Sequence, residues 1–499
     1  MVRYKYLNRK QMEMICINLE DQILPGTFEY ALDDIIDNHV DLSIFDNKYK
    51  NDHKGAKAYP TNAMLKTVLY AYSLGIISSR AIEYQCRKNT VFMALGNCIT
   101  PDHSTVADFI SDMEEEAIEI FIKVLLFCDN LGLLGKEMFA VDGCKLGSNA
   151  SKEMSGTFKD FEKKIEKTRR IVKKLVEKHK GIDDKELKES LEKKIKKHNN
   201  KASKFKKFMK DHEKKRGHRN RERKSNITDN ESAKMFSSHG FIQGYNGISI
   251  VDSKHQVVIY PEAFGTVGEA EVFKGTMNEA RKIAAKAGIS KDIFKGKKVI
   301  CDTGYFSEAN CKYIDDNNID GYIPDQYFRQ RDPRYPEKNE YRKRKNLYTQ
   351  EAFTYDEEND YYICPNNKEL KSDGKNIKYH EYRGNRYKAK KEDCENCLKQ
   401  GKCLKKGSKR RQLFFTVESP DKTYSKRMIE KIDREESRDI YSQRMGIVEP
   451  VFGNVTYHKR LNRFTLRGKK KVNVQWVLYM MVHNIEKILN YGGKYKVKV

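Results

Sequence analysis

Apolar residues in the N-terminal part of the chain recur at intervals of three and four, the spacing of amphipathic helices. Pro60 and Thr61 mark a helix start, and the next residues present one apolar face made of Met64, Leu65, Val68 and Leu69. Further helix starts follow along PDHSTVADFI. We therefore expect residues 60–134 to be helical throughout, within a helical N-terminal domain at 1–134.

Beyond residue 134 the pattern changes to that of strands. MFAVDGCKLG (138–147) is a short apolar run that ends in Asp142 and Gly143, which predicts a strand with an acid at its end. GYNGISIVDS and HQVVIYPEAF read as two further strands, and GKKVICDTGYFS as a strand with Asp302 at its end. Helical patterns separate some of them, so the order predicts an α/β fold with a mixed sheet and flanking helices.

Two insertions interrupt this core. Residues 158–224 are very basic and carry a thin apolar seam, which predicts an antiparallel helical hairpin. Residues 327–412 are basic, rich in tyrosine and contain four cysteines. The expected organisation is a helical domain at 1–134, a first strand at 135–157, the hairpin at 158–224, the core at 225–326, the cysteine-containing insertion at 327–412 and a helical C-terminal part of the core at 413–499.

The charge balance indicates a polyanionic partner. The 499 residues include 97 Lys and Arg against 71 Asp and Glu, a formal net charge of +26. Such an excess repels itself in a compact fold unless an anion compensates it, and nucleic acid is the first candidate. An anionic membrane is the weaker one, because no run of about 18 apolar residues is present. The N-terminus lacks an apolar signal core and the cysteine count is odd, so we expect a reducing cytoplasm.

Three acids are candidates for a metal site. Asp142 and Asp302 each close an apolar strand, and side chains at strand ends line the functional edge of an α/β sheet. Two adjacent carboxylates need a cation between them, and Mg²⁺ prefers such oxygen ligands. Glu449, in QRMGIVEPVFG, could complete the site from a helix, and Pro450 after it suggests a helix start or a kink. Taken singly, an Asp at a strand end is more often a turn or cap residue.

Three motifs in the same order resemble the acidic motifs of DDE insertion-sequence transposases. They are AVDGCKLGSNASKE, VICDTGYFSEAN and SQRMGIVEPVFGNV, and they most resemble the group numbered eleven eighty-two. AMLKTVLYAYSLGIISSRAIE, PDHSTVADF and NITDNESAKMF are also similar to that family, and the resemblance extends over nearly the whole chain from about residue 55.

This resemblance implies an RNase H-like catalytic core with Asp142 on the first strand, Asp302 on the fourth and Glu449 on the last helix. It implies that two Mg²⁺ (or Mn²⁺) ions, about 4 Å apart, are held by these three residues and support in-line phosphoryl transfer. Water would cut the element ends, and the freed 3′-hydroxyl would attack target DNA. The implied partners are double-stranded DNA, as terminal inverted repeats and target, and a second copy of the chain in the DNA complex. The implied location is the bacterial cytoplasm, at the nucleoid and away from membranes.

Relatives carry a Tyr/Arg/Glu/Lys signature around the third acid, and this chain departs from it. Tyr441 and Arg444 match the signature, with Arg444 expected to contact DNA phosphate. Thr456 stands where the lysine is expected, and only Lys459 or Arg460 could replace it. The basic run RFTLRGKKKV (463–472) follows, and its cations Arg463, Arg467, Lys469 and Lys470 are further candidate DNA contacts. A charge run is more often a solvated face.

The four cysteines of the insertion could hold a structural zinc ion. Cys394 and Cys397 form a C-x-x-C pair, with Cys403 after them and Cys364 upstream, and tetrahedral zinc takes four such thiolates. His380 is an alternative ligand. The other interpretation is four unrelated reduced thiols.

Three hypotheses remain open from the sequence. The first is a transposase that cuts and rejoins DNA. The second is a transposase-derived DNA-binding protein without activity, for which the Thr456 departure leaves room. The third is an RNA-binding or structural protein that acts through its charge.

Overall fold

The computed structural model describes residues 16–49, 57–217, 220–237, 240–335, 347–379, 382–404, 407–418 and 423–495. The chain divides into two compact units. The first contains residues Met1–Ile300 and Gln443–Val499, and the second contains residues Cys301–Ser442.

The first unit begins with a set of helices that pack around one apolar core. They are α1 (Phe28–Asn38), α2 (Thr61–Ser73), α3 (Ser79–Lys88), α4 (Thr90–Leu95), α5 (His103–Asp112) and α6 (Glu114–Asn130). The predicted apolar face of α2 is buried, and α2 begins at Thr61 as its sequence indicates. Buried Lys66 joins α2 to α1 through ion pairs with Asp33 and Asp37, each at 2.7 Å. The prediction of a helical N-terminal region is confirmed.

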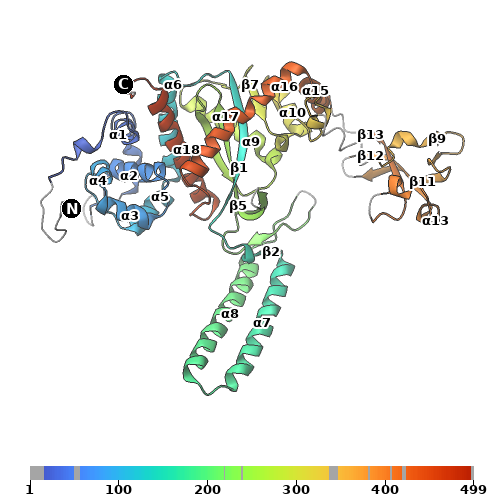
Figure 1. The fold of residues 1–499 in the computed structure, drawn as a ribbon, viewed down its shortest axis with the longest axis horizontal. Helices are drawn as coiled ribbons and strands as arrows, with labels where there is room; N and C mark the ends of the chain where they lie inside the picture. The colour runs from blue at the N-terminus through green and yellow to red at the C-terminus, as the bar shows by residue number, and fades with distance from the viewer. Residues whose placement is uncertain are drawn as a thin grey trace, which may run out of the picture. The chain divides into compact units, whose positions relative to one another are not determined.

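A long helix near the C-terminus, α18 (Lys469–Tyr491), lies between these helices and the sheet (Figure 1). It is buried on nearly all sides and contacts α2, α6 and the sheet. Trp476 donates its indole N–H to the Ile248 carbonyl at 3.1 Å, and the Asn484 amide donates to the Val258 carbonyl at 2.9 Å. These polar contacts fix α18 against the backbone of the sheet.

The sheet of the first unit carries its strands in the order β4 (Ala233–Ser237), β5 (Gly240–Asp252), β1 (Met138–Gly147) and β7 (Lys298–Cys301). Strand β6 (Val258–Phe264) also pairs with β5, antiparallel. Strand β1 pairs antiparallel along one edge of β5, from Phe139 opposite Asp252 to Gly147 opposite Gly244. The other edge of β5 is shared by β4 and β6.

Helices cover this sheet. Helix α9 (Glu269–Lys286) packs on β6, and α17 (Arg444–Gly453) packs on β1 and β5. The predicted α/β class with a mixed sheet is confirmed, and it is compatible with an RNase H-like core. Strand β4 is an addition that the sequence pattern had not indicated.

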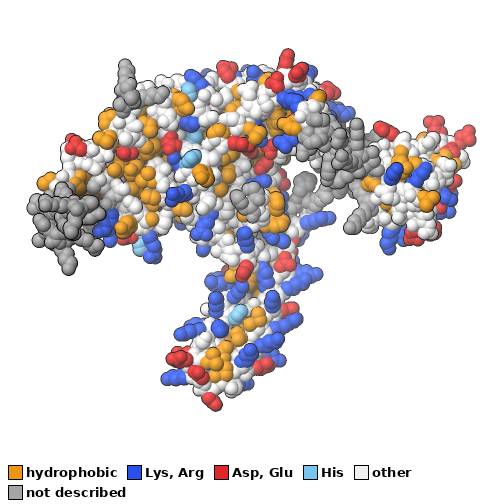
Figure 2. All heavy atoms as spheres, in the orientation of Figure 1, with side chains coloured by type: hydrophobic (Ala, Val, Ile, Leu, Met, Phe, Trp, Pro, Cys, Tyr) orange, Lys and Arg blue, Asp and Glu red, His pale blue; other side chains and the backbone are white. Residues whose placement is uncertain are grey.

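Between β1 and β4 the chain forms two long helices side by side, α7 (Phe158–Lys180) and α8 (Lys185–Asp211) (Figure 1). A capping box at Thr157 and Asp160 starts α7. The two helices pack against each other through an apolar cluster of Phe158, Phe161, Ile165, Ala202, Phe205 and Phe208. Lys and Arg side chains extend outward along both helices (Figure 2).

The second unit contains two groups of elements. The first group includes α10 (Glu308–Asp316), β8 (Asp320–Tyr322), α11 (Phe328–Arg331), α15 (Thr423–Ile432) and α16 (Glu435–Ser442). The second is an antiparallel sheet in the order β13 (Gln412–Glu418), β12 (Tyr382–Ala389), β11 (Glu369–Tyr379), β10 (Tyr361–Ile363) and β9 (Thr354–Asp356). Its small core consists of Phe353, Leu370, Tyr387, Ala389 and Leu413.

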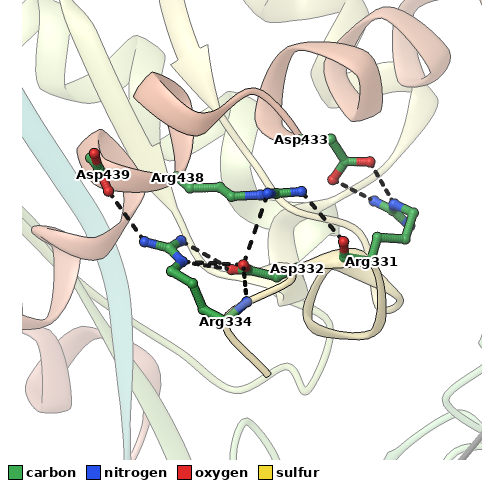
Figure 3. Close-up of polar contacts among 6 residues, drawn as sticks. All are labelled: Arg331, Asp332, Arg334, Asp433, Arg438 and Asp439. Carbon is green, nitrogen blue, oxygen red and sulfur yellow. Dashed lines mark hydrogen bonds and ion pairs between the residues drawn. The ribbon is translucent and has the colours of Figure 1, made fainter. Parts of the chain in front are cut away.

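A polar network joins the end of α11 to α15 and α16 (Figure 3). Arg331 pairs with Asp433 at 2.6 Å, and Arg334 bridges Asp332 at 3.0 Å and Asp439 at 3.2 Å. Asp332 is fully buried. Burial acts to raise its pKa, but the hydrogen bonds from Arg334 and the charges of Arg334 and Arg438 together hold that pKa below its usual range. A buried carboxylate without such partners would be strongly destabilising.

Candidate active site

Asp142 lies within strand β1, which continues five residues past it to Gly147. The expectation that the strand ends at Asp142 and Gly143 was therefore wrong. Gly143 does not make a turn: it pairs with Ile248 of β5, and a Cβ there would stand 2.6 Å from Oδ1 of Asn246. The glycine is needed for close packing against a side chain, which a single sequence cannot distinguish from a turn.

The Asp142 carboxylate forms an ion pair with the guanidinium of Arg444, at the first residue of α17. The two side chains are only 18% and 13% exposed, so the pair is largely shielded from water. The Asp142 carboxylate also accepts from the Gly143 backbone N–H at 2.8 Å. This ion pair joins the strand of the first predicted acid to the helix of the third.

Glu449 lies in the interior of α17 and its side chain is exposed. The helix begins at Arg444 and Pro450 stands inside it, so of the two alternatives that Pro450 suggested, a helix start or a kink, the helix start is excluded. A proline cannot donate to the carbonyl four residues earlier, which belongs to Gly446. The Gln256 side chain donates to that carbonyl at 3.0 Å instead. This contact explains how α17 accommodates Pro450 beside the candidate acid.

Asp302 lies in the second unit, directly after β7. It is the N-cap of the 3-10 turn η4 (Thr303–Tyr305), and its carbonyl accepts from the Tyr305 N–H at 3.0 Å. Tyr305 is fully buried, which anchors the turn. The structure thus brings the strand of Asp142 and the helix of Glu449 together in one unit, and the approach of Asp302 to them stays a prediction.

A π-helical turn, η6 (Asn454–His458), follows α17 and contains Thr456. The Thr456 hydroxyl donates to the Phe452 carbonyl at 2.7 Å. Lys459 is buried and its ammonium forms an ion pair with Glu486. Arg460 is exposed, with a left-handed backbone at φ 55°. Of the two replacements that the sequence offered for the signature lysine, Arg460 is the one whose side chain reaches solvent.

The basic run after η6 returns to the end of β1. The Phe464 N–H donates to the Gly147 carbonyl at 2.8 Å, and Arg467 Nε donates to the Asn149 carbonyl at 2.7 Å. Arg463 and Arg467 are exposed. These two cations therefore lie beside the strand that carries Asp142, although their contact with DNA stays a prediction.

The next two lysines of the run each reach an acid. Lys469 Nζ lies 2.8 Å from Glu262, and Lys470 Nζ lies 3.0 Å from Glu114. The Lys470 side chain is well exposed, so its ion pair is weak and could open to a phosphate. Tyr441 lies in the second unit, where its ring packs edge-on against Phe328 at 5.3 Å.

The four cysteines of the insertion line one small hollow of about 20 Å³. Cys364 follows β10, and the backbone N–H groups of Asn366 and Lys368 both lie 3.3 Å from its sulfur. The other three come from α13 (Lys391–Glu395), α14 (Gln400–Cys403) and the residues between them. His380, the alternative ligand, lies outside the described residues.

Among the residues that the structure describes, no group of three or more His, Cys, Asp or Glu side chains is arranged so as to hold a metal ion. Neither the candidate acids nor the four cysteines of the insertion form such a group in the side-chain conformations of this structure. Within the same residues, no helix is both long and apolar enough to cross a lipid bilayer.

Sequence reasoning missed a second cationic feature of the first unit. A hollow of about 710 Å³ is lined by Lys215, Arg216, Arg223, Lys224, Lys234 and Phe241, among others. The sequence had indicated only that residues 158–224 are very basic. The sequence did not predict that this basic segment lies against β4 and the start of α9, because β4 is only five residues long.

Two stretches of the chain match known protein families. Residues 17–112 match a transposase domain (DUF772), and residues 363–489 match a transposase DDE domain. Searches of curated proteins and of solved structures found no significant match. The second stretch contains Glu449 and the four cysteines, whereas Asp142 and Asp302 lie upstream of it. The matches confirm the resemblance to DDE-type insertion-sequence transposases and indicate a transposase function, without identifying the insertion-sequence group.

Proposed function

We propose that this chain is an active DNA transposase that binds the terminal inverted repeats of an insertion sequence, cuts them and joins them to target DNA. One observation carries the proposal beyond the family matches: Arg444 at the start of α17 pairs with Asp142 on β1. Glu449 follows five residues later in the same helix, a rise of about 7.5 Å. Two of the three predicted acids thereby lie on elements that pack together.

The chemistry consists of two phosphoryl transfers. In the first, a water oxygen attacks a phosphorus at the element end, the bond to the 3′-oxygen breaks, and that oxygen leaves as a 3′-hydroxyl. In the second, this hydroxyl loses its proton and attacks a phosphorus of target DNA, releasing a target 3′-hydroxyl. Both are in-line displacements, so positioning and charge stabilisation supply the catalysis.

Asp142, Asp302 and Glu449 are the residues proposed to hold two Mg²⁺ or Mn²⁺ ions. The donor set fits, because these metals prefer carboxylate oxygens. The Asp142 carboxylate is paired with the Arg444 guanidinium, which a metal ion bound at this carboxylate would have to displace. The ions would supply Lewis acidity for the attacking and leaving oxygens.

The exposed cations after α17 are proposed to hold the DNA. Arg460, Arg463, Arg467 and Lys470 are all exposed, and Arg463 and Arg467 lie beside the end of β1. Lys459 and Lys469 would contact phosphate only after leaving Glu486 and Glu262. Joining two element ends in one reaction requires two active sites, so we propose that two copies of the chain act together.

The decisive experiment is a nicking assay on labelled terminal-repeat DNA with Mg²⁺ or Mn²⁺. We expect metal-dependent cleavage that is lost in Asp142→Asn, Asp302→Asn and Glu449→Gln. Glu119→Gln is the matched control, because Glu119 is an acid of the same unit whose ion pair with Lys286 joins α6 to α9. Specific binding of the repeats without cleavage by the unaltered chain would instead favour the transposase-derived DNA-binding protein.

Zinc at the four cysteines is a separate part of the proposal. All four thiols line one hollow, and two backbone N–H groups donate to the Cys364 sulfur. Binding would require the thiols to turn toward a common centre, and zinc would reinforce a small apolar core.

Elemental analysis of the purified full chain tests this directly. We expect one zinc per chain, reduced in Cys394→Ser and Cys397→Ser and unchanged in Cys98→Ser, which alters an exposed cysteine elsewhere. Protein that is purified without chelators and contains no zinc, and takes up none, would refute the zinc site.

A further inference from the structure

The cationic hollow of the first unit lies next to two exposed aromatic side chains. Phe236 of β4 and Phe241 of β5 stand opposite each other in the strand register, with ring centroids 5.3 Å apart and an interplanar angle of 75°. Their exposed fractions are 66% and 59%. Phe241 also lines the hollow, so the aromatic pair and the cations form one continuous surface.

The direction of this pair is set by the strand, because successive residues point to opposite faces. Met235, the neighbour of Phe236, is buried, so the apolar face of β4 is already occupied. The two phenylalanines are therefore on the outward face, together with Lys234, whose ammonium lies 4.8 Å from the Phe241 ring. Leaving two large apolar rings in water is unfavourable and marks a binding surface.

The charges of the hollow favour an anion. Arg216, Arg223, Lys224 and Lys234 are all exposed. Lys215 is half-buried and donates to the Asn230 carbonyl. Among the described residues, Glu271 lies 3.3 Å from Arg223, and Asp229 and Glu231 act on Lys215 through their charges. Cations therefore outnumber acids at this surface.

We infer that this surface binds an unpaired stretch of DNA, with phosphates in the hollow and a base against the Phe236–Phe241 pair. The inference rests on the proposed function only in taking DNA as the partner. Closely placed aromatic rings and cations match a nucleotide strand whose bases are unstacked, because every base has a face that can stack on a ring. A duplex hides those faces and presents its phosphates and the base edges of its grooves instead.

The test uses a fluorescein-labelled single-stranded oligothymidylate and the full chain. In Phe236→Ala/Phe241→Ala we expect affinity for it to fall by about 5- to 150-fold, the range for losing one base stack. Affinity for terminal-repeat duplex should stay within about twofold. Phe236→Leu/Phe241→Leu keeps the apolar area and should lose nearly as much as the alanine variant. Tyr84→Ala, which removes an exposed ring in α3, is the control and should bind normally.

The cations have their own readout. Lys224→Gln/Lys234→Gln should lower the slope of log affinity for the oligonucleotide against log salt by about 0.7 per lost phosphate contact. The phenylalanine variants should leave that slope unchanged, because stacking releases no counterions.

Two results would overturn the inference. One is an unchanged oligonucleotide affinity in both phenylalanine variants. The other is loss of self-association in those variants, measured by sedimentation, with oligonucleotide binding intact, which would assign the surface to a second copy of the chain. Failure of the proposed function is distinguishable: unaltered protein would then fail to cut terminal-repeat DNA, whatever its affinity for the oligonucleotide.

Discussion

Replacing Arg444 by Gln should make the chain bind Mn²⁺ more tightly while impairing DNA cleavage. Arg444 forms an ion pair with the Asp142 carboxylate, and a metal ion that uses this carboxylate must compete with the guanidinium. Glutamine keeps much of the side-chain length and removes the charge. The competition then disappears, so the metal no longer has to open the pair.

The magnitude follows from the burial of the pair. Both side chains are less than a fifth exposed, so an effective dielectric constant near 20 is appropriate, and two unit charges about 4 Å apart then attract by about 4 kcal/mol. Desolvation of the two groups cancels part of this, which leaves about 1–3 kcal/mol for opening the pair. We therefore expect Mn²⁺ affinity to rise by about 5- to 150-fold.

The assay is Mn²⁺ titration of the DNA-free protein, with free Mn²⁺ followed by electron paramagnetic resonance. Arg463→Gln is the matched control, because it removes an exposed arginine from the same unit and should leave the affinity unchanged. Cleavage by Arg444→Gln should stay low even at saturating metal if this arginine contacts phosphate. An affinity that is equal to or weaker than that of the unaltered protein would refute competition at Asp142.

Three further predictions concern the contacts that support this unit. Burial lowers the pKa of His483 to about 3, whereas its pKa in the unfolded chain is about 6.5, so the free energy of unfolding should fall as pH drops below about 6.5. Between pH 7 and 5, His483→Gln should reduce this loss of stability by about 2 kcal/mol, measured by urea titration. Gln256 has φ 60° and its side chain donates to the Gly446 carbonyl. Gln256→Gly and Gln256→Ala both lose that contact, but only alanine has a Cβ that strains the left-handed backbone. The alanine variant should therefore be less stable by about 1 kcal/mol in the same titrations. Burial opposes ionisation of Asp34, yet hydrogen bonds, led by that from the Tyr495 hydroxyl at 2.5 Å, lower its pKa to about 2. Asp34→Asn should therefore lower the free energy of unfolding by about 2 kcal/mol at pH 7. This difference from the unaltered chain should vanish as pH falls from about 4 through 2. Acid denaturation curves that coincide for the variants and the unaltered chain would contradict the first and third of these, and equal midpoints for the two Gln256 variants the second.

Local pattern was sufficient for the elements that bury one face. The apolar face of α2 at Met64, Leu65 and Val68 could be predicted because helical periodicity and a Pro–Thr start coincide. Strand β1 was also recognised, but its end was not. Gly143 continues the strand because of a side chain on β5, and that information lies a hundred residues away in the sequence.

The contacts of the candidate site also depend on residues that lie far apart in the sequence. Asp142 and Arg444 are separated by 302 positions, and neither has a periodic neighbour that indicates the pair. Arg444 was expected at DNA phosphate, and nothing in its surroundings pointed to a carboxylate. The exposure of Phe236 and Phe241 was likewise unpredictable, since alternation along a strand does not say which face the fold covers.

The placement of Glu449 depends on four such distant contacts acting together. Arg444 ties the start of α17 to β1, and Gln256, from the turn between β5 and β6, holds the carbonyl that Pro450 leaves unpaired. After the helix, the Asn454 amide lies 3.0 Å from Nδ1 of His483 on α18, and His483 Nε2 lies 2.9 Å from the Gln256 carbonyl. Gln256 and His483 thus link both ends of α17 to the sheet and to α18. A substitution at either residue would displace the candidate acid without touching it, so loss of cleavage there should be accompanied by loss of stability, whereas Glu449→Gln should abolish cleavage and leave the unfolding midpoint unchanged.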